Sequence, residues 1–235
     1  MGIKLGKLKN YFNNDELASN VWLTKYALKD KSGKVLEETP DDMHNRIASE
    51  FARIEEKFGG KSALTKEQIF NLIKNFDYIV PQGSPMMGIG NNHVNVSLSN
   101  CVVVASPEDN ISAIIDSSKD LANLFKRRCG VGLDLSQLRP EGTPVNNSAG
   151  TTTGAWSFAD LYSYVCRMIG QNGRRGALMI SMDIRHPDIE KFVTMKHDLT
   201  KVTGANVSVK ISDEFMEAVQ NNGSFTLRFP VDEEN

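Results

Sequence analysis

The sequence predicts an α/β fold in which a helical N-terminal region, up to about residue 80, precedes a parallel α/β sheet or barrel. Two observations predict it. Apolar residues recur at helical spacing between Leu17 and Phe76, and helix-start and helix-stop signals delimit them. From about residue 100 onward, short apolar runs alternate with helix-like segments, which is typical of a parallel sheet covered by helices. A chain of 235 residues is long enough to bury a core in one or two domains.

The N-terminal region predicts two helices. The first is expected over residues 40–58, because Thr39 is a good N-cap, Pro40 suits the first helical position and a glycine pair follows the segment. The second is expected over residues 66–76. Their apolar positions are Ile47, Phe51 and Ile54 in the first helix and, facing inward, Ile69, Leu72, Ile73 and Phe76 in the second. We interpret this region as a helical support without chemistry of its own.

The remainder of the chain alternates between strand and helix signals. The run CVVV, residues 101–104, is expected to be a buried strand, because continuous apolar runs are typical of strands covered on both faces. The later elements are expected as a helix over 111–128, the short segment VGLDL at 131–135, a helix over 156–169, a strand within 173–184, a helix within 186–196, a strand within 205–212 and a helix within 213–223.

Composition narrows the classes of function. A net charge of -2 with 24% charged residues argues against recognition of duplex nucleic acid. The sequence contains no apolar run approaching the roughly 20 residues of a membrane span, so a cytoplasmic protein is expected. Cys101, Cys129 and Cys166 have neither CxxC nor zinc-ligand spacing, and a small buried thiol is the ordinary interpretation of each. The four histidines are scattered, which argues against a metal site.

Residues 130–158, GVGLDLSQLRPEGTPVNNSAGTTTGAWSF, are rich in glycine, threonine, serine and asparagine. Such a composition is compatible with a flexible linker or with a loop that binds an anion. The stretch contains neither the GxxxxGK[ST] pattern of a phosphate-binding P-loop nor the GxGxxG of a dinucleotide-binding turn. Arg174, Arg175 and Lys201 are basic groups whose ordinary interpretation is solvated surface.

Six segments, in this order and spacing, carry a resemblance: PQGSP, SLSNC, KRRCGVGLDLSQLRPEGTPV, TTTGAWSF, QNGRRGALMISMDIRHPDIEKF and VTGANVSVKISDEF. Together they resemble the catalytic subunit of ribonucleotide reductase, and the GRRGALM and HPDIE blocks are most similar to its adenosylcobalamin-dependent class. The resemblance implies a helical domain at residues 1–80 and, at 81–235, the first half of a ten-stranded α/β barrel. It also implies reduction of a ribonucleotide, expected to be a diphosphate, to its 2'-deoxy form by thiyl-radical chemistry for DNA synthesis.

The resemblance also assigns roles to single residues. Cys101 matches the first reductant cysteine, which closes a disulfide with a second cysteine that neither Cys129 nor Cys166 matches. Ser84, Asn100 and Gly130 match residues that line the substrate pocket, although the family often has serine where Asn100 stands. A glycine suits a close approach of backbone to the ribose.

The glycine-rich loop resembles the first loop of the family's allosteric specificity site, which binds a deoxynucleoside triphosphate at a homodimer interface. Asp109 matches a carboxylate that faces the effector's sugar, and Arg139 matches a cation that faces its phosphates. Asn146 and Asn147 stand where the family often has a second basic residue. The segment HDLTKVTGA, residues 197–205, matches the second loop, with Lys201 as the expected reader of the effector and Asn206 at its end. A plain barrel connection is the alternative.

Other parts expected from the resemblance do not occur in these residues. An NLCxE block, which would carry the radical cysteine, is absent from residues 1–235, as are a second reductant cysteine and a C-terminal CxxC. We therefore expect this chain to be inactive without a C-terminal complement. The implied partners are that complement, a thioredoxin-type reductant and the ribonucleotide. Adenosylcobalamin is the expected cofactor, with a separate metal-containing radical-generating subunit as the alternative. A non-catalytic deoxynucleotide-binding relative is the alternative function, and control by dATP at an N-terminal cone is not expected.

Overall fold

The computed structural model describes residues 2–169 and 176–232, with side chains from residue 6 onward. Arg174 and Arg175 lie outside the described residues. The chain divides into two compact units, residues 1–100 and 101–235. The division falls about twenty residues beyond the expected domain boundary at residue 80, because the segment after residue 80 adds a further helix to the first unit.

The first unit is helical. Its helices are α1 (Gly2–Tyr11), α2 (Glu16–Lys25), α3 (Pro40–Phe58), α4 (Lys66–Ile73) and α5 (Gly83–Gly88), with short 3-10 turns at Gly60–Ser62 and Lys74–Phe76. The predicted start of α3 is confirmed: Thr39 precedes it, and the Asp42 carboxylate accepts the Thr39 backbone N–H at 3.1 Å. In α4, Thr65 and Gln68 cap each other reciprocally.

The inward face of α4 is narrower than its sequence predicts. Ile69 and Ile73 are buried, but Leu72 is 36% exposed. The helix ends at Ile73, and Asn75 has a φ of 54°, so the helical period does not continue to Phe76. On α3, Ile47 is buried, whereas Phe51 and Ile54 remain exposed. The core of the unit consists of Leu8, Trp22, Ala27, Met43, Ile47, Ala48, Ile69 and Ile73.

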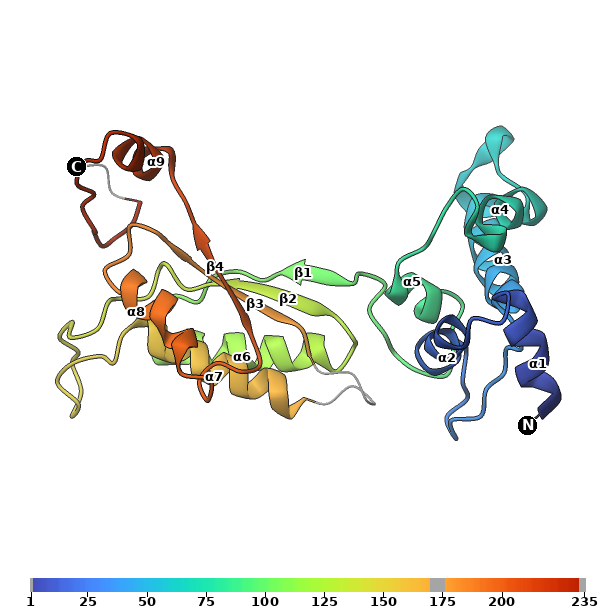
Figure 1. Ribbon diagram of the computed structural model, residues 1–235, viewed down its shortest axis with the longest axis horizontal. Coiled ribbons are helices and arrows are strands. Elements are labelled where there is room, and N and C mark those ends of the chain that lie inside the picture. Colours follow the sequence, from blue (N-terminus) through green and yellow to red (C-terminus); the bar gives the residue numbers. More distant parts are fainter. Residues whose placement is uncertain (1, 170–175, 233–235) are drawn as a thin grey trace. The chain divides into compact units, whose positions relative to one another are not determined.

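The second unit is a parallel sheet with helical crossovers. Its elements are β1 (Cys101–Val103), α6 (Ile111–Phe125), β2 (Gly130–Asp134), α7 (Ala155–Met168), β3 (Leu178–Asp183), α8 (Ile189–Thr194), a 3-10 turn at Met195–His197, β4 (Asn206–Lys210) and α9 (Asp213–Gln220). The strand order is β1-β2-β3-β4, and every neighbouring pair is parallel. The predicted alternation of strands and helices is confirmed (Figure 1).

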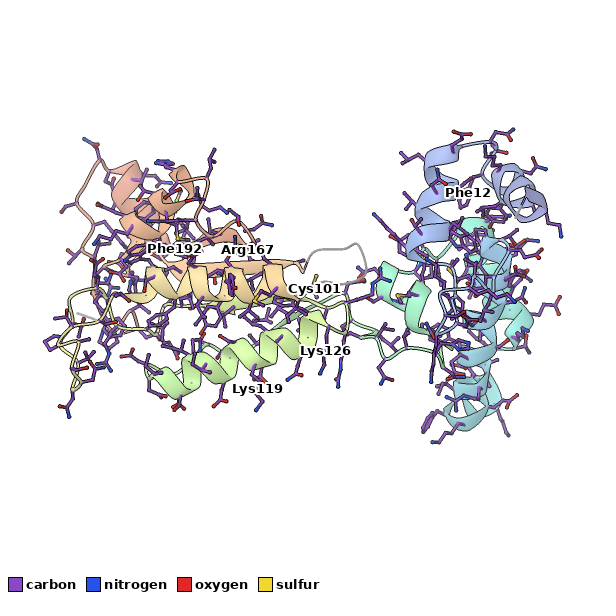
Figure 2. The ribbon with its side chains drawn as sticks, turned by 90° about the horizontal axis from the view of Figure 1, so that it is seen from below. Phe12, Cys101, Lys119, Lys126, Arg167 and Phe192 are labelled. Atoms are coloured by element: carbon purple, nitrogen blue, oxygen red, sulfur yellow. The ribbon has the colours of Figure 1, made fainter. Side chains whose placement is uncertain are left out.

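The sheet has two unlike faces. Helices α6 and α7 lie on one side of it (Figure 1) and run side by side, with the exposed Lys119 on α6 (Figure 2). The residues turned toward the helices form the core, among them Val131, Leu133, Leu178, Ile180 and Met182. The register pairs Cys101 with Gly130 and Met179 with both Gly132 and Asn206, which puts these alternate residues together on the opposite face. We call it the open face.

The prediction that CVVV forms a buried strand was half wrong. Residues 101–103 do form β1, but Cys101 and Val103 are exposed, and Val103 is 86% exposed. The reason is that β1 is an edge strand whose odd-numbered residues lie on the open face, where no described element covers them. Only Val102 and Val104 pack against the core. Among the described residues, no helix combines the length and the apolar character needed to cross a membrane.

Candidate functional site

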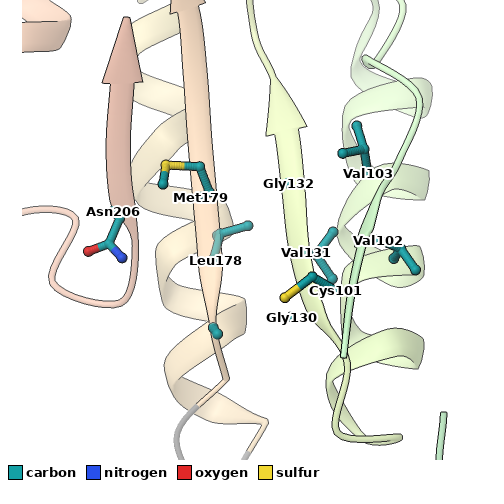
Figure 3. A pocket seen from close by; sticks show the side chains of 10 residues that line it. Cys101, Val102, Val103, Gly130, Val131, Gly132, Leu178, Met179 and Asn206 are labelled. Carbon is teal, nitrogen blue, oxygen red and sulfur yellow. The ribbon is translucent and has the colours of Figure 1, made fainter. Parts of the chain in front are cut away.

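A hollow of about 370 Å³ lies on the open face, over the amino ends of the strands. Its lining is Cys101, Val102, Val103, Gly130, Val131, Gly132, Ala177, Leu178, Met179 and Asn206 (Figure 3). All four strands contribute to it. The hollow is mostly apolar, and the Cys101 thiol and the Asn206 carboxamide are its polar side chains.

The thiol of Cys101 is exposed and lies beside a residue without a side chain. Gly130 is the register partner of Cys101 on β2, so nothing projects from β2 at that level of the open face. Figure 3 shows the sulfur of Cys101 close to Gly130 and the side chain of Asn206 on β4, at the opposite edge of the sheet from β1. A ligand can therefore approach the thiol closely over β2.

The three cysteines differ in their surroundings. Cys129 and Cys166 are buried, and burial raises the pKa of the Cys166 thiol. The Cys129 thiol donates to the carbonyl of Gly130 at 3.3 Å. Nucleophilic or redox chemistry needs an accessible thiol, and among the described cysteines only Cys101 offers one.

Ser84 and Asn100, both predicted to line the substrate pocket, are in contact with each other in the first unit. The Asn100 side-chain oxygen accepts the Ser84 backbone N–H at 2.8 Å, and its amide nitrogen donates to Gln82. Ser84 is buried in the first turn of α5. Asn100, the residue directly before Cys101, thus holds the start of α5 through its side chain.

Asp109 and Arg139, both predicted to bind an effector, also contact each other. The Arg139 Nε lies 2.5 Å from Asp109 Oδ2, and the Arg139 backbone N–H donates to Asp109 Oδ1 at 3.1 Å. The guanidinium also donates to the carbonyls of Asp109 at 3.2 Å and Pro144 at 3.4 Å. The arginine is therefore oriented by Asp109, and its partly exposed guanidinium stands at the start of the segment 139–154, which we call the first loop.

The base of the first loop is closed by a residue to which the sequence interpretation gave no role. The Asp188 carboxylate accepts the N–H groups of Glu141, at 3.0 Å, and Ala155, at 2.8 Å. His186 Nε2 lies 2.8 Å from the Leu138 carbonyl. His186 and Asp188 are both buried, and a buried carboxylate requires donors, which was the signal available in the sequence. Asp188 therefore anchors both ends of the first loop, which a linker would not require.

Gly154 shows how tightly this base is packed. Its φ is +89°, and a Cβ at this position would lie 2.5 Å from Asp188 Oδ2 and 2.7 Å from the Glu141 nitrogen. Only glycine satisfies both the backbone conformation and the space.

The second loop, residues 197–205, lies along α7. Its backbone N–H groups at Val202 and Gly204 donate to Asp160 at 3.0 Å and to Ser163 at 2.8 Å. The Lys201 ammonium lies 5.6 Å from the centroid of the Trp156 ring. Asn206, predicted at the end of the second loop, lines the hollow that contains Cys101, because it is the first residue of β4.

The other end of the open face is polar. Asp134 accepts the Ser181 hydroxyl at 2.6 Å, and Lys210 Nζ lies 3.2 Å from the same oxygen. Burial by itself raises the pKa of Asp134, but hydrogen bonds from Ser181 and Ser136 and the charge of Lys210 outweigh it and lower the pKa. Within the described part of the chain, no group of three metal-ligating side chains is found.

A parallel sheet with helices on one side, an exposed thiol at the start of its first strand and two anchored loops defines an α/β protein with a candidate site at Cys101. The chain matches the ribonucleotide reductase barrel domain over residues 99–235 and the ribonucleotide reductase all-alpha domain over residues 12–93. It belongs to the ribonucleotide reductase large-subunit family.

Named relatives agree with this assignment. The vitamin B12-dependent ribonucleoside-diphosphate reductase of Mycobacterium tuberculosis (strain CDC 1551 / Oshkosh) is 32% identical over 216 residues, which cover 91% of this chain and 30% of that protein. The enzyme of the same name from Thermoplasma acidophilum is 28% identical, over 91% of this chain and 35% of that protein. The ribonucleoside-diphosphate reductase large chain of Neurospora crassa is 30% identical over 57% of this chain. The chain thus spans about a third of the first two relatives.

Proposed function

We propose that this chain is the N-terminal part of a cytoplasmic reductase that converts ribonucleoside diphosphates to 2'-deoxyribonucleotides, with Cys101 as one of two reductant thiols. The observation that carries the proposal is the exposed Cys101 thiol beside Gly130 in a hollow on the open face. The relatives named as ribonucleoside-diphosphate reductases support the reaction and the diphosphate substrate. They do not favour the non-catalytic alternative.

The net chemistry balances with two thiols. Cys101 and a second cysteine outside residues 1–235 give up two electrons and two protons, the ribose 2'-hydroxyl leaves as water, a hydrogen takes its place and the cysteines become a disulfide. The disulfide requires Cα atoms roughly 4.4 to 6.8 Å apart. A thioredoxin-type partner then reduces it. Ser84, Asn100 and Gly130 are proposed to position the substrate.

The radical that starts the reaction is proposed to come from adenosylcobalamin. The names of the relatives from Mycobacterium tuberculosis and Thermoplasma acidophilum support this cofactor. The match to the Neurospora crassa large chain keeps a separate metal-containing radical-generating subunit as the alternative. In either case the radical cysteine is supplied by the C-terminal complement, since no NLCxE block occurs in this sequence.

The two anchored loops are proposed to bind a deoxynucleoside triphosphate that selects the substrate. Arg139 is oriented by Asp109 and would face the phosphates, and Asp109 would face the sugar. Lys201 would read the identity of the effector, with Asn206 at the end of the second loop. A homodimer at this site is supported by exposed apolar side chains on the outer sides of α6 and α7, which are Ile111, Ile115, Tyr164 and Met168.

Equilibrium binding of the four deoxynucleoside triphosphates to this chain tests the effector site. Arg139→Ala is expected to weaken binding about 10- to 100-fold, because charge-assisted hydrogen bonds to phosphate are lost. Arg53→Ala is the control, because Arg53 also pairs with a carboxylate, Glu50 at 2.6 Å, but on the more exposed surface of the first unit. Equal affinities of the Arg139 and Arg53 variants, both folded by circular dichroism, would rule out the assignment of Arg139.

Reconstitution tests the catalytic role. This chain mixed with a C-terminal complement and adenosylcobalamin is expected to reduce ribonucleoside diphosphates, and Cys101→Ser is expected to abolish turnover with a thioredoxin-type reductant. Cys166→Ser is the control, because this buried thiol has no role in the proposed reaction. Full turnover by the Cys101 variant would contradict the proposal.

A further inference from the structure

Trp156 stands between the first and second loops. It is the second residue of α7, directly after the base of the first loop, and its ring is half-buried. An indole offers two different contacts, a single N–H donor at its edge and a π face. In this chain the two contacts go to two different loops.

The edge of Trp156 contacts the first loop. Its Nε1 donates to Glu141 Oε2 at 2.9 Å. The same oxygen accepts a hydrogen bond from Lys191 on α8. The Lys191 ammonium and then the Trp156 N–H lower the pKa of Glu141, so both contacts favour the carboxylate form. Glu141 is also the residue whose backbone N–H is held by Asp188. Movement of the base of the first loop therefore moves the acceptor of the indole.

The face of Trp156 contacts the second loop. Lys201 Nζ lies over the ring, 5.6 Å from its centroid. The neighbouring backbone is held by α7 through Asp160 and Ser163, so the Lys201 side chain is the part of this loop that depends on the indole. A cation over an indole face is attracted by the ring quadrupole, and the attraction depends on how the ring is turned.

We propose that Trp156 is a positioning residue that couples the two loops, with its N–H bound to Glu141 and its ring face holding Lys201. A ligand that displaces Glu141 turns the indole and thereby changes the position of Lys201. The nature of that ligand, a deoxynucleoside triphosphate, rests on the proposed function. The coupling between the loops does not.

The coupling is tested first without nucleotide, by NMR on the full chain. The readout is the ring-current shift of the Lys201 side-chain protons, and the exchange rates of the Val202 and Gly204 amides, which α7 holds, serve as an internal control. Glu141→Ala is expected to reduce the population of Lys201 over the ring about two- to five-fold, which corresponds to an exposed cation–π contact and is seen as a smaller ring-current shift, while the exchange rates of the two amides stay unchanged. In a Trp156→Leu background, Glu141→Ala is expected to have no further effect on the second loop.

Trp156→Phe separates the two contacts, because phenylalanine keeps a ring face and lacks the N–H. It is expected to retain a ring-current shift on Lys201 that no longer responds to Glu141→Ala. Lys57→Met is the matched control, since Lys57 lies over the Phe58 ring in the first unit at 4.9 Å. The inference is overturned if Glu141→Ala leaves the Lys201 side chain unchanged. It is also overturned if Glu141→Ala has the same effect on Lys201 in the native chain and in the Trp156→Leu variant.

Nucleotide binding distinguishes failure of the coupling from failure of the proposed function. If the deoxynucleoside triphosphates bind, Trp156→Leu is expected to reduce the spread of their four dissociation constants by about two- to five-fold, whereas Lys57→Met leaves the spread unchanged. An unchanged spread in Trp156→Leu would overturn the coupling. If none binds while the ring-current measurements show coupling, the proposed function fails and the coupling stands.

Discussion

The two faces of the parallel sheet differ as strongly as the interior and the surface of a protein, although their residues alternate along the same strands. On β3, Ile180 is fully buried against the helices, whereas its neighbour Met179 is 43% exposed on the open face. On β1 and β2 the open face carries Cys101 opposite Gly130. The covered face stabilises the fold by burying apolar area, and the open face leaves its residues available for chemistry.

The largest expected difference concerns the cysteines. Cys101 on the open face should react with iodoacetamide at least about a thousandfold faster than Cys166, which becomes accessible only when the core opens and whose pKa is raised by burial. Mass spectrometry of timed alkylation measures both rates. In Cys101→Ser the fast reaction should disappear, and in denaturant the remaining cysteines should react alike. Comparable native rates for Cys101 and Cys166 would contradict the assignment of the two faces.

A smaller effect is expected from truncating neighbouring residues of β3. Ile180→Ala should lower the free energy of unfolding by about 2 to 5 kcal/mol, because it leaves a cavity in a packed core. Met179→Ala should lower it by less than about 1 kcal/mol, since its side chain is largely in water. Urea denaturation of both variants checks the difference. Equal losses would mean that the open face is covered in solution.

The smallest expected effect concerns the polar end of the open face. The pKa of Asp134 is lowered in the folded state, so more protons bind to this group in the unfolded chain, and its stabilisation is present above the ordinary aspartate pKa of about 3.9. Asp134→Asn should therefore lower the free energy of unfolding by about 1 to 2 kcal/mol near pH 6.

The difference in free energy of unfolding between the native chain and Asp134→Asn should shrink as the pH falls from about 4 through the lowered pKa of Asp134. Denaturation at several pH values measures it. Asp116→Asn on α6 is a control, because Asp116 is exposed. A loss for Asp134→Asn that does not vary with pH would exclude the carboxylate as its source.

Local signals predicted the elements well, because caps and periodicity act within a few residues. Thr39 and Pro40 placed the start of α3, and the alternation after residue 100 anticipated β1, β3 and β4 and marked a short segment where β2 lies. The predictions failed where they concerned which residues are covered by other elements and where a helix ends. The apolar run at β1 gave no sign that Cys101 and Val103 lie on an open face, and the spacing of Leu72 gave no sign that α4 stops at Ile73.

The site was predictable only in part. The resemblance singled out Cys101, Asp109, Arg139 and Lys201, and the Asp109–Arg139 contact joins residues 30 apart in the chain. It gave no role to Asp188, which closes the first loop from 47 residues away, or to Trp156, which contacts both loops. Contacts at such separations depend on which strands and helices become neighbours, and local patterns do not contain that information.

The sequence by itself determined the helical first unit, the order of the parallel strands' segments and the family to which the chain belongs, because these follow from periodicity, capping residues and matching motifs. Only the tertiary structure decided which of two alternating residue sets is buried, that Asn206 shares a hollow with Cys101, and that Trp156 lies between the loops. The physical reason is that burial and side-chain contacts are properties of neighbouring elements in space, and strand register sets them only when the sheet assembles.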